Sequence, residues 1–297
     1  MRRCPRQSGF VLLLILVLVA ICGIAMAATA RRYGEKIMQS NAAVKELQFR
    51  WGACSCQRTI LPQANGLLTE QCKPKAPPPA LMCHQVMLGG MRFNLVVGDE
   101  CAKSNVNLLA KQHDDAGMLA CVRRLQGDDR RLLNVELSPL TDADAPADES
   151  AFPVKYEGFE QFFAIRHPSE LGLQSAGGGV SACRRLTFWS DGQVNLWRAD
   201  IPVLRETLQG LLTESNLMAL DDLRRKTAVK DLDRGKAFAK MQLTDEQTTA
   251  LGPLIRETSD CFSLWVYAEG ANRSWYRLYV QRQDGGGNNA KQWVFAW

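Results

Sequence analysis

The chain has 297 residues, of which 46% are hydrophobic and 23% are charged, and its formal net charge is +5. This composition excludes an intrinsically disordered chain and fits a globular ectodomain of one large or two small domains. The mild positive charge does not require nucleic acid or an anionic lipid surface as a partner.

An uncharged apolar run from Phe10 to Thr29 follows three arginines near the N-terminus. About 20 apolar residues suffice for one α-helical crossing of a bilayer. Past this run, apolar residues recur every seven positions in two interleaved series, Ile37, Val44 and Trp51, and Leu47, Cys54 and Leu61. The spacing predicts one apolar seam on a helix that continues out of the membrane. From Phe10 to about Leu61 the rod would be about 75 Å long.

Two other interpretations of the N-terminus compete with a permanent span. A secretory signal peptide would be cleaved after Ala27 or Ala30, although the apolar core is longer than such a segment usually needs. Lipidation at Cys22 is disfavoured because bulky Ile21 precedes it. Basic residues lie on both sides of the run, so the positive-inside rule only slightly favours a cytoplasmic N-terminus.

Ten cysteines are present, eight of them outside the N-terminal region and the apolar run. An even number in an exported domain permits disulfides, and proximity in sequence favours Cys72 with Cys83 and Cys101 with Cys121. Buried free thiols are the alternative, and the sequence leaves both open. Cys54 and Cys56 point apart on a helix and cannot bridge each other.

The long helix should end near Pro62, because an interior proline breaks or kinks a helix. Residues 73–79 hold four prolines and predict an extended linker. The β-formers at 84–88 and 91–97 flank Gly89-Gly90, which predicts a hairpin with a two-residue turn.

A mainly helical region should follow. Helical spacing marks 108–126 and 158–166, an acidic loop lies at 141–150, and a glycine-rich break lies at 177–179. Strand signals at 185–189 and 193–197 flank the turn Ser190-Asp191-Gly192. Helices are expected at 202–212 and 214–225, and a last helix contains Leu243 and 251–255. Three strands of an antiparallel meander then occupy 261–268, 274–282 and 292–297.

Sites for chemistry are weakly marked. The helix pair around Gly210 resembles a helix-hairpin-helix unit, but its turn has one glycine and an acidic residue, so we expect a packed pair that binds no nucleic acid. Cys83-His84 lacks the paired spacing of a zinc site. The acidic loop lacks the EF-hand pattern, and no motif places a base beside a nucleophile. We therefore predict no enzyme and no certain cofactor.

The residues Arg6-Gln7-Ser8-Gly9-Phe10 and the apolar run after them resemble the leader of a type IV pilin or pseudopilin. The resemblance implies that a prepilin peptidase cuts after Gly9 and that Phe10 is N-methylated. Most members of this superfamily carry Glu at the fifth mature position, where this chain has Leu14. The minor pseudopilin K family of type II secretion systems lacks that Glu, so within the superfamily the chain resembles this family most.

Two further segments resemble pseudopilin K. One is a strand that ends in Asp-Glu and leads into a Gly-Lys-hydrophobic-Asn-Leu-Asn pattern, represented by Asp99, Glu100, Lys103, Asn105 and Asn107, with Ala102 in place of the usual Gly. The other contains Asn195, with Trp197 where the family usually has Asn. Asn105 or Asn107 suits a helix N-cap, and Asn107-Leu108 and Asn195-Leu196 are expected to be two related helix starts.

The expected fold is α+β, with a long N-terminal transmembrane helix packed on an antiparallel, pilin-like sheet and an inserted helical subdomain. Residues 1–9 would be the leader and 10–72 the long helix. Residues 73–100 and 255–297 would form the sheet, and 101–254 the insertion. Residues expected in helix packing are Leu14, Val44, Leu47 and Trp51, the last three against the sheet together with Cys54, so that Leu47→Asp should be strongly destabilising.

The resemblance implies a minor pseudopilin at the tip of a pseudopilus, in the bacterial inner membrane with its ectodomain in the periplasm, that assists protein export. Its partners would be minor pseudopilins I and J, the pseudopilus, prepilin peptidase and inner-membrane lipid. Calcium binding is implied by the family, with ligands that the sequence does not identify. The alternatives are a non-polymerising membrane-anchored receptor or adhesin, and a minor pilin of a type IV pilus.

Overall fold

A computed structural model describes residues 7–70, 76–126, 154–165, 168, 182–228, 231–269, 273–283 and 290–296. The predicted linker at 73–79 lies partly outside these residues, and the acidic loop and the glycine-rich break lie wholly outside. The chain divides between Trp51 and Gly52 into two compact units. The sheet and the helical region therefore belong to one unit, which also contains the end of the long helix.

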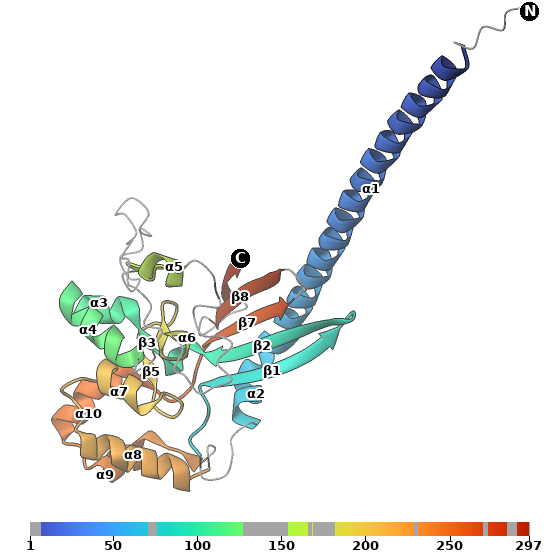
Figure 1. Cartoon of the computed structure of the whole chain (residues 1–297). Coiled ribbons are helices and arrows are strands. Elements are labelled where there is room, and N and C mark those ends of the chain that lie inside the picture. Colours follow the sequence, from blue (N-terminus) through green and yellow to red (C-terminus); the bar gives the residue numbers. More distant parts are fainter. Residues whose placement is uncertain are drawn as a thin grey trace, which may run out of the picture. The chain divides into compact units, whose positions relative to one another are not determined.

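The N-terminal helix α1 runs without interruption from Gln7 to Ile60 (Figure 1). It ends where the sequence predicts, because Pro62 starts the 3-10 turn η1, Leu61–Gln63. The chain then resumes as the α-helix α2, Ala64–Glu70, instead of leaving the helical path at Asn65-Gly66. A continuous helix from the apolar run to the ectodomain is thus confirmed.

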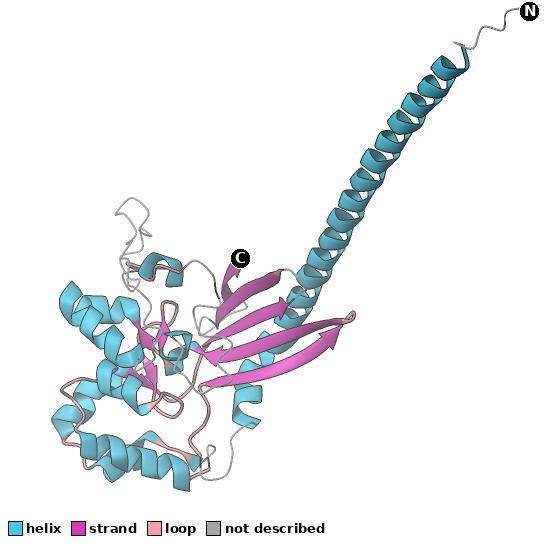
Figure 2. Cartoon of the chain, viewed as in Figure 1, coloured by secondary structure: helices cyan, strands magenta, loops and turns pink. Residues whose placement is uncertain are grey.

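Five strands form an antiparallel sheet in the order β1-β2-β7-β8-β9 (Figure 2). The strands are β1 Leu81–Leu88, β2 Met91–Asp99, β7 Cys261–Glu269, β8 Ser274–Gln283 and β9 Ala290–Ala296. Gly89 and Gly90 both have positive φ, +58° and +77°, as a primed two-residue turn requires. The predicted hairpin, the C-terminal meander and the α+β, pilin-like class are confirmed.

Both faces of this sheet are buried at its central strands, β2, β7 and β8, whereas β1 and β9 are largely exposed. On one face Phe93, Leu95 and Val97 of β2 lie in register with Ala268, Val266 and Leu264 of β7, and all six are at most 1% exposed. On the other face Val96, Trp265, Leu278 and Phe295 form one cross-strand row that packs into the helical region. Each large apolar side chain buried in this way contributes roughly 1.5–3 kcal/mol.

Small residues at the end of α1 pack against the sheet face that carries Phe93. Gly52, Ala53 and Cys56 are buried, and a Cβ on Gly52 would lie 2.2 Å from Cζ of Phe93. The packing of Val44, Leu47, Trp51 and Cys54 on the sheet stays a prediction, because the first three belong to the N-terminal unit and the sheet to the other. The first three are 52%, 55% and 68% exposed, and Cys54 is only partly buried. The sheet's own aromatic side chains fill the interface, so the helix face that meets them must be small.

The helical region contains α3 Val106–Gln112, α4 Asp115–Gln126, α5 Phe159–Phe162, α6 Ala182–Arg185, α7 Ile201–Thr207, α8 Glu214–Lys226, α9 Arg234–Met241 and α10 Asp245–Leu251. Figure 1 shows most of them grouped at one end of the sheet. The predicted helix at 158–166 is only the single turn α5, and the structure adds α9, which the sequence analysis missed. The 3-10 turns η2, Glu100–Ala102, and η5, Gly252–Leu254, complete the region.

The strands expected on either side of Ser190-Asp191-Gly192 form two short parallel bridges and do not pair with each other. β3 Ser104–Asn105 pairs with β4 Leu186–Thr187, and β5 Val194–Asn195 pairs with β6 Ile255–Arg256. The strand signals are correct in place, but the partners are distant in sequence. Which strands pair depends on how the buried side chains of each strand pack, and the neighbouring sequence does not predict this packing.

Candidate functional site

Strand β2 ends in a buried carboxylate. Asp99 is 0% exposed, and its Oδ1 accepts a hydrogen bond from the backbone N–H of Cys101 at 3.0 Å. Its Oδ2 accepts from Oγ of Ser259 at 2.6 Å, Nη1 of Arg198 at 3.2 Å and Nδ2 of Asn195 at 3.5 Å. Burial raises the pKa of Asp99, and the Arg198 charge and the Ser259 hydrogen bond oppose that rise. The two family-like segments therefore meet at one carboxylate.

Arg198 connects this carboxylate to the end of the N-terminal helical stretch. It is 6% exposed, and its Nη2 donates to Oγ1 of Thr69 at 2.7 Å and to the carbonyl of Asn65 at 3.2 Å. Removal of one partner from a buried ion pair typically costs about 3–5 kcal/mol, because the other charge is left uncompensated. Arg198 thus ties α2 to the end of β2.

A second ion pair lies beside the first. Nζ of Lys103 donates to Oε1 of Glu100, with both side chains at most 2% exposed. A Cβ on Gly98 would lie 3.2 Å from this Nζ and 2.8 Å from Oγ of Ser263, so the strand has no room for a side chain there. Oε2 of Glu100 and Oγ of Ser263 have no hydrogen-bond partner within the described chain.

Asn105 and Asn195 make the same local hydrogen bonds, although only Asn105 starts a helix, since Asn195 precedes a turn and α7 begins after Asp200. Oδ1 of Asn105 accepts from the backbone N–H of Asn107 at 2.8 Å and of Leu108 at 3.2 Å. Oδ1 of Asn195 accepts from residues 197 and 198 at 2.9 and 3.2 Å. Each Asn ends a two-residue parallel bridge. The expected match of Asn107 with Asn195 is therefore wrong by two positions, and Asn105 is the N-cap.

Asn107 holds a separate loop. Its Oδ1 accepts from the backbone N–H groups of Lys155 and Tyr156, both at 2.8 Å. Its Nδ2 donates to the carbonyls of Tyr156 at 2.9 Å and Phe188 at 3.4 Å. Four hydrogen bonds from one 2% exposed amide fix the backbone that leads into α5. All six family-like residues are thus buried and structural, and none of their side chains is exposed to a ligand from solvent.

Several buried or partly buried ionic residues escaped the sequence analysis. Arg256 makes a two-pronged ion pair with Asp260 at 2.6 and 2.8 Å and lies 3.3 Å from Asp191. Arg224 is 3% exposed and donates to the carbonyls of Leu196 and, at 2.8 Å, Ala199. Burial lowers the pKa of Arg224 to about 10. No local pattern separates these arginines from exposed ones, because their partners lie elsewhere in the chain.

The predicted disulfide between Cys101 and Cys121 is wrong. Both are buried free thiols, and Sγ of Cys101 lies 3.3 Å from Oδ1 of Asp260 and 3.4 Å from Nη1 of Arg256. Proximity in sequence misled the prediction, because η2 and α4 carry the two thiols to different neighbours. Cys83 is also free, and Cys72 lies outside the described residues.

Metal ligands do not gather in the described part of the chain: no three His, Cys, Asp or Glu side chains there are placed to hold an ion. Asp99 is occupied by Arg198 and Ser259, and Glu100 by Lys103. The described residues therefore do not fit a calcium ion, and calcium stays an implication of the family resemblance alone.

The N-terminal part of α1 is the other predicted feature. Gly9 lies in its first turns, Phe10 is 69% exposed and Leu14 is 53% exposed. By length and composition, one helix in the described residues, counted from Phe10, is apolar enough to cross a membrane. It presents large apolar side chains on all sides from Phe10 to Met26, as expected of a lipid-facing or helix-facing segment.

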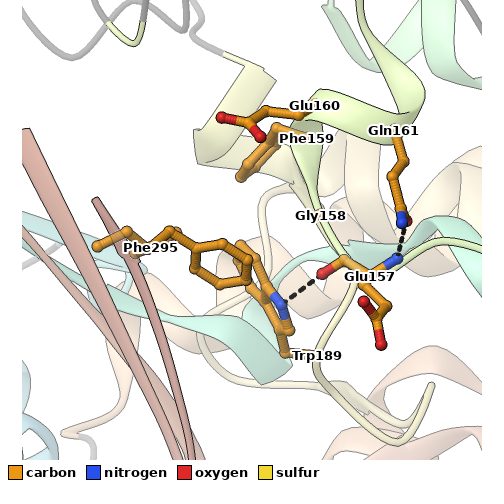
Figure 3. Close-up of a pocket in the computed structure, with 8 residues that line it drawn as sticks. Glu157, Gly158, Phe159, Glu160, Gln161, Trp189 and Phe295 are labelled. Carbon is orange, nitrogen blue, oxygen red and sulfur yellow. Dashed lines mark hydrogen bonds between the residues drawn. The ribbon is translucent and has the colours of Figure 1, made fainter. Parts of the chain in front are cut away.

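A small cavity lies where α5 meets the sheet edge (Figure 3). Its volume is about 200 Å³, and Phe159, Trp189 and Phe295 form its aromatic walls. The ring centroids of Trp189 lie 5.6 Å from Phe159 and 5.7 Å from Phe295. Nε1 of Trp189 donates to the carbonyl of Glu157 at 2.8 Å, which holds the loop against the ring. Glu160 also lines this cavity.

No family model and no curated protein sequence matches this chain. Among solved structures, it is similar to a chain of the GspK-GspI-GspJ complex from the enterotoxigenic Escherichia coli Type 2 Secretion System. The two chains share 14% sequence identity with a TM-score of 0.47, over 87% of this chain and 99% of that chain.

Proposed function

We propose that this chain is a minor pseudopilin of a type II secretion system, a structural subunit that is not an enzyme. One observation carries the proposal. A single helix begins beside the leader-like junction Gly9-Phe10, continues as an apolar span, and reaches Ile60 without a break. Its end then packs on an antiparallel sheet. A subunit that leaves the membrane to join a fibre needs such a continuous helical connection between span and ectodomain.

The apolar surface of α1 supports lateral assembly. Leu14, Val44 and Leu47 are more than half exposed. Val44 and Leu47 lie beyond the length of one bilayer crossing. Outside lipid, exposed apolar side chains of this size favour burial against another helix, worth roughly 1.5–3 kcal/mol each when complete. We infer that neighbouring helices cover them.

The ectodomain supports a place at the tip. The helical region between β2 and β7 makes the subunit bulkier than a helix and a sheet alone, which disfavours repetition along a fibre. Leu14 offers no carboxylate to pair with the charged N-terminus of a subunit above it. By the family resemblance, minor pseudopilins I and J would lie below. The chain would be processed by prepilin peptidase in the inner membrane, with its ectodomain in the periplasm.

The mass of the mature N-terminus tests this function. We expect purified protein from its native membrane to begin with N-methylated Phe10, and a Gly9→Leu variant to keep its leader. An intact Met1 would instead support a non-polymerising anchored receptor or adhesin. A chain that starts at Ala28 or Arg31 would mean simple secretion. Either result overturns the proposal.

A further inference from the structure

Arg256 lies where three segments that are distant in the chain meet. Its Nη1 donates to Oδ1 of Asp260 at 2.6 Å and to Oδ2 of Asp191 at 3.3 Å, and its Nη2 donates to Oδ2 of Asp260 at 2.8 Å. Sγ of Cys101 lies 3.4 Å from the same Nη1. Asp191 belongs to the loop between β4 and β5, Cys101 to η2, and Asp260 to the loop before β7. One guanidinium therefore connects groups from three separate segments.

Other contacts help to fix the two carboxylates. Oδ1 of Asp191 accepts from the backbone N–H two residues further on, at 3.0 Å, while its Oδ2 faces Arg256. Ser259, the residue before Asp260, donates to the buried Asp99 at 2.6 Å and so ties this loop to the end of β2. Both carboxylates are therefore held in place partly by contacts that do not involve Arg256.

The charges of this cluster call for a cation between the carboxylates. Oδ2 of Asp191 and Oδ1 of Asp260 are at most about 6 Å apart, the sum of their distances from Nη1, so their charges repel unless a positive charge lies between them. The two side chains are 26% and 25% exposed, so water and ions can reach them. Calcium binds carboxylate oxygens at about 2.3–2.6 Å and completes its shell with water. A guanidinium and a calcium ion would thus compete for the same two carboxylates.

We propose that Arg256 takes the place of a divalent cation at this junction. The guanidinium supplies the positive charge between Asp191 and Asp260, so the three segments stay together without calcium. Removal of the guanidinium leaves two facing carboxylates, and calcium then binds between them. The disagreement with the calcium binding that the family resemblance implies has, at this junction, a physical reason. The inference does not depend on the proposed function.

Thermal unfolding of the full-length chain in detergent, followed by circular dichroism, tests this exchange. About 10 mM calcium chloride is compared with sodium chloride of equal ionic strength. We expect calcium to raise the melting temperature of Arg256→Ala by about 3–5 °C more than that of the unchanged chain, as for a site with a dissociation constant of about 1 mM. Arg256→Gln keeps a hydrogen-bond donor, so it is a milder second variant that should show the same extra rise. An equal rise in the variants and the unchanged chain would overturn the proposal.

Three controls assign the effect to the two aspartates. Asp191→Asn in the Arg256→Ala chain removes one carboxylate and should abolish the extra rise; if the rise persists, the assigned pair is refuted. Arg256→Lys keeps a positive charge between the carboxylates and should show no extra rise, although it loses the two-pronged geometry. Arg205→Ala is the matched control, because Arg205 makes a two-pronged pair with the single carboxylate of Glu214, at 3.1 and 2.7 Å. A calcium response of Arg205→Ala as large as that of Arg256→Ala would also overturn the proposal.

Discussion

Gly52→Ala tests how the long helix is attached to the sheet. Gly52 lies in the interior of α1, where alanine would normally stabilise the helix by about 1 kcal/mol. Here the new Cβ would lie 2.2 Å from Cζ and 2.8 Å from Cε1 of Phe93. The Phe93 ring is 0% exposed, so it has no solvent to move into. The steric cost should therefore exceed the gain in helix propensity.

Overpacking of a tight core typically costs about 1–3 kcal/mol. The close approach to an enclosed ring places the cost in the upper part of this range, about 2–3 kcal/mol, so after the propensity gain of about 1 kcal/mol is subtracted Gly52→Ala should destabilise the ectodomain by about 1–2 kcal/mol. For a domain of this size, that corresponds to a fall in melting temperature of about 2–8 °C. The double variant with Phe93→Leu should recover part of the loss, because the smaller side chain leaves room for the methyl group.

Thermal unfolding of the full chain in detergent, followed by circular dichroism, measures these shifts. Gly34→Ala is the matched control, because a Cβ there meets nothing within 4 Å and should not lower the melting temperature. If Gly52→Ala melts at or above the temperature of the unchanged chain, the close approach of helix and sheet is refuted. Strictly additive effects of Gly52→Ala and Phe93→Leu would refute their contact in the same way.

Three further variants test the junction and the exposed helix. Arg198→Leu should cost about 3–5 kcal/mol in urea unfolding, against less than about 1 kcal/mol for the exposed Arg205→Leu. The loss of unfolding free energy should be larger at pH 7 than at pH 5. Without the guanidinium, the pKa of Asp99 in the folded chain rises further. A carboxyl with a raised pKa in the folded chain lowers the free energy of unfolding as the pH climbs above about 4, its usual pKa in an unfolded chain. Equal losses for the two arginines would contradict this role. Asn107→Ala should cost about 2–3 kcal/mol, because it leaves buried backbone groups without partners, and an unchanged urea midpoint would exclude that role. Leu47→Asp should change the free energy of unfolding by less than about 0.5 kcal/mol yet abolish co-purification with sister subunits. A large fall in melting temperature would instead support packing of Leu47 on the sheet.

The sequence by itself determined the features that depend on local patterns. The apolar run fixes a helix long enough to cross a bilayer, and Pro62 fixes where α1 ends. Gly89 and Gly90 determine the β1–β2 turn because both adopt positive φ. The C-terminal strands follow from β-formers between turn residues. The sequence also limits the N-cap of α3 to Asn105 or Asn107, and the structure selects Asn105. Each of these depends on neighbours within a few residues.

Only the tertiary structure decided what those elements contact. Small residues such as Gly52, which the periodic apolar seam does not include, meet the sheet, since Phe93 already fills the space. Asp99 was recognised in the sequence, but its partner Arg198 lies 99 positions away. Burial of an ion pair depends on which distant surfaces close over it, and the cost of desolvation then selects a specific partner. Periodicity records which side chains are apolar, whereas the fold decides how much room each one has.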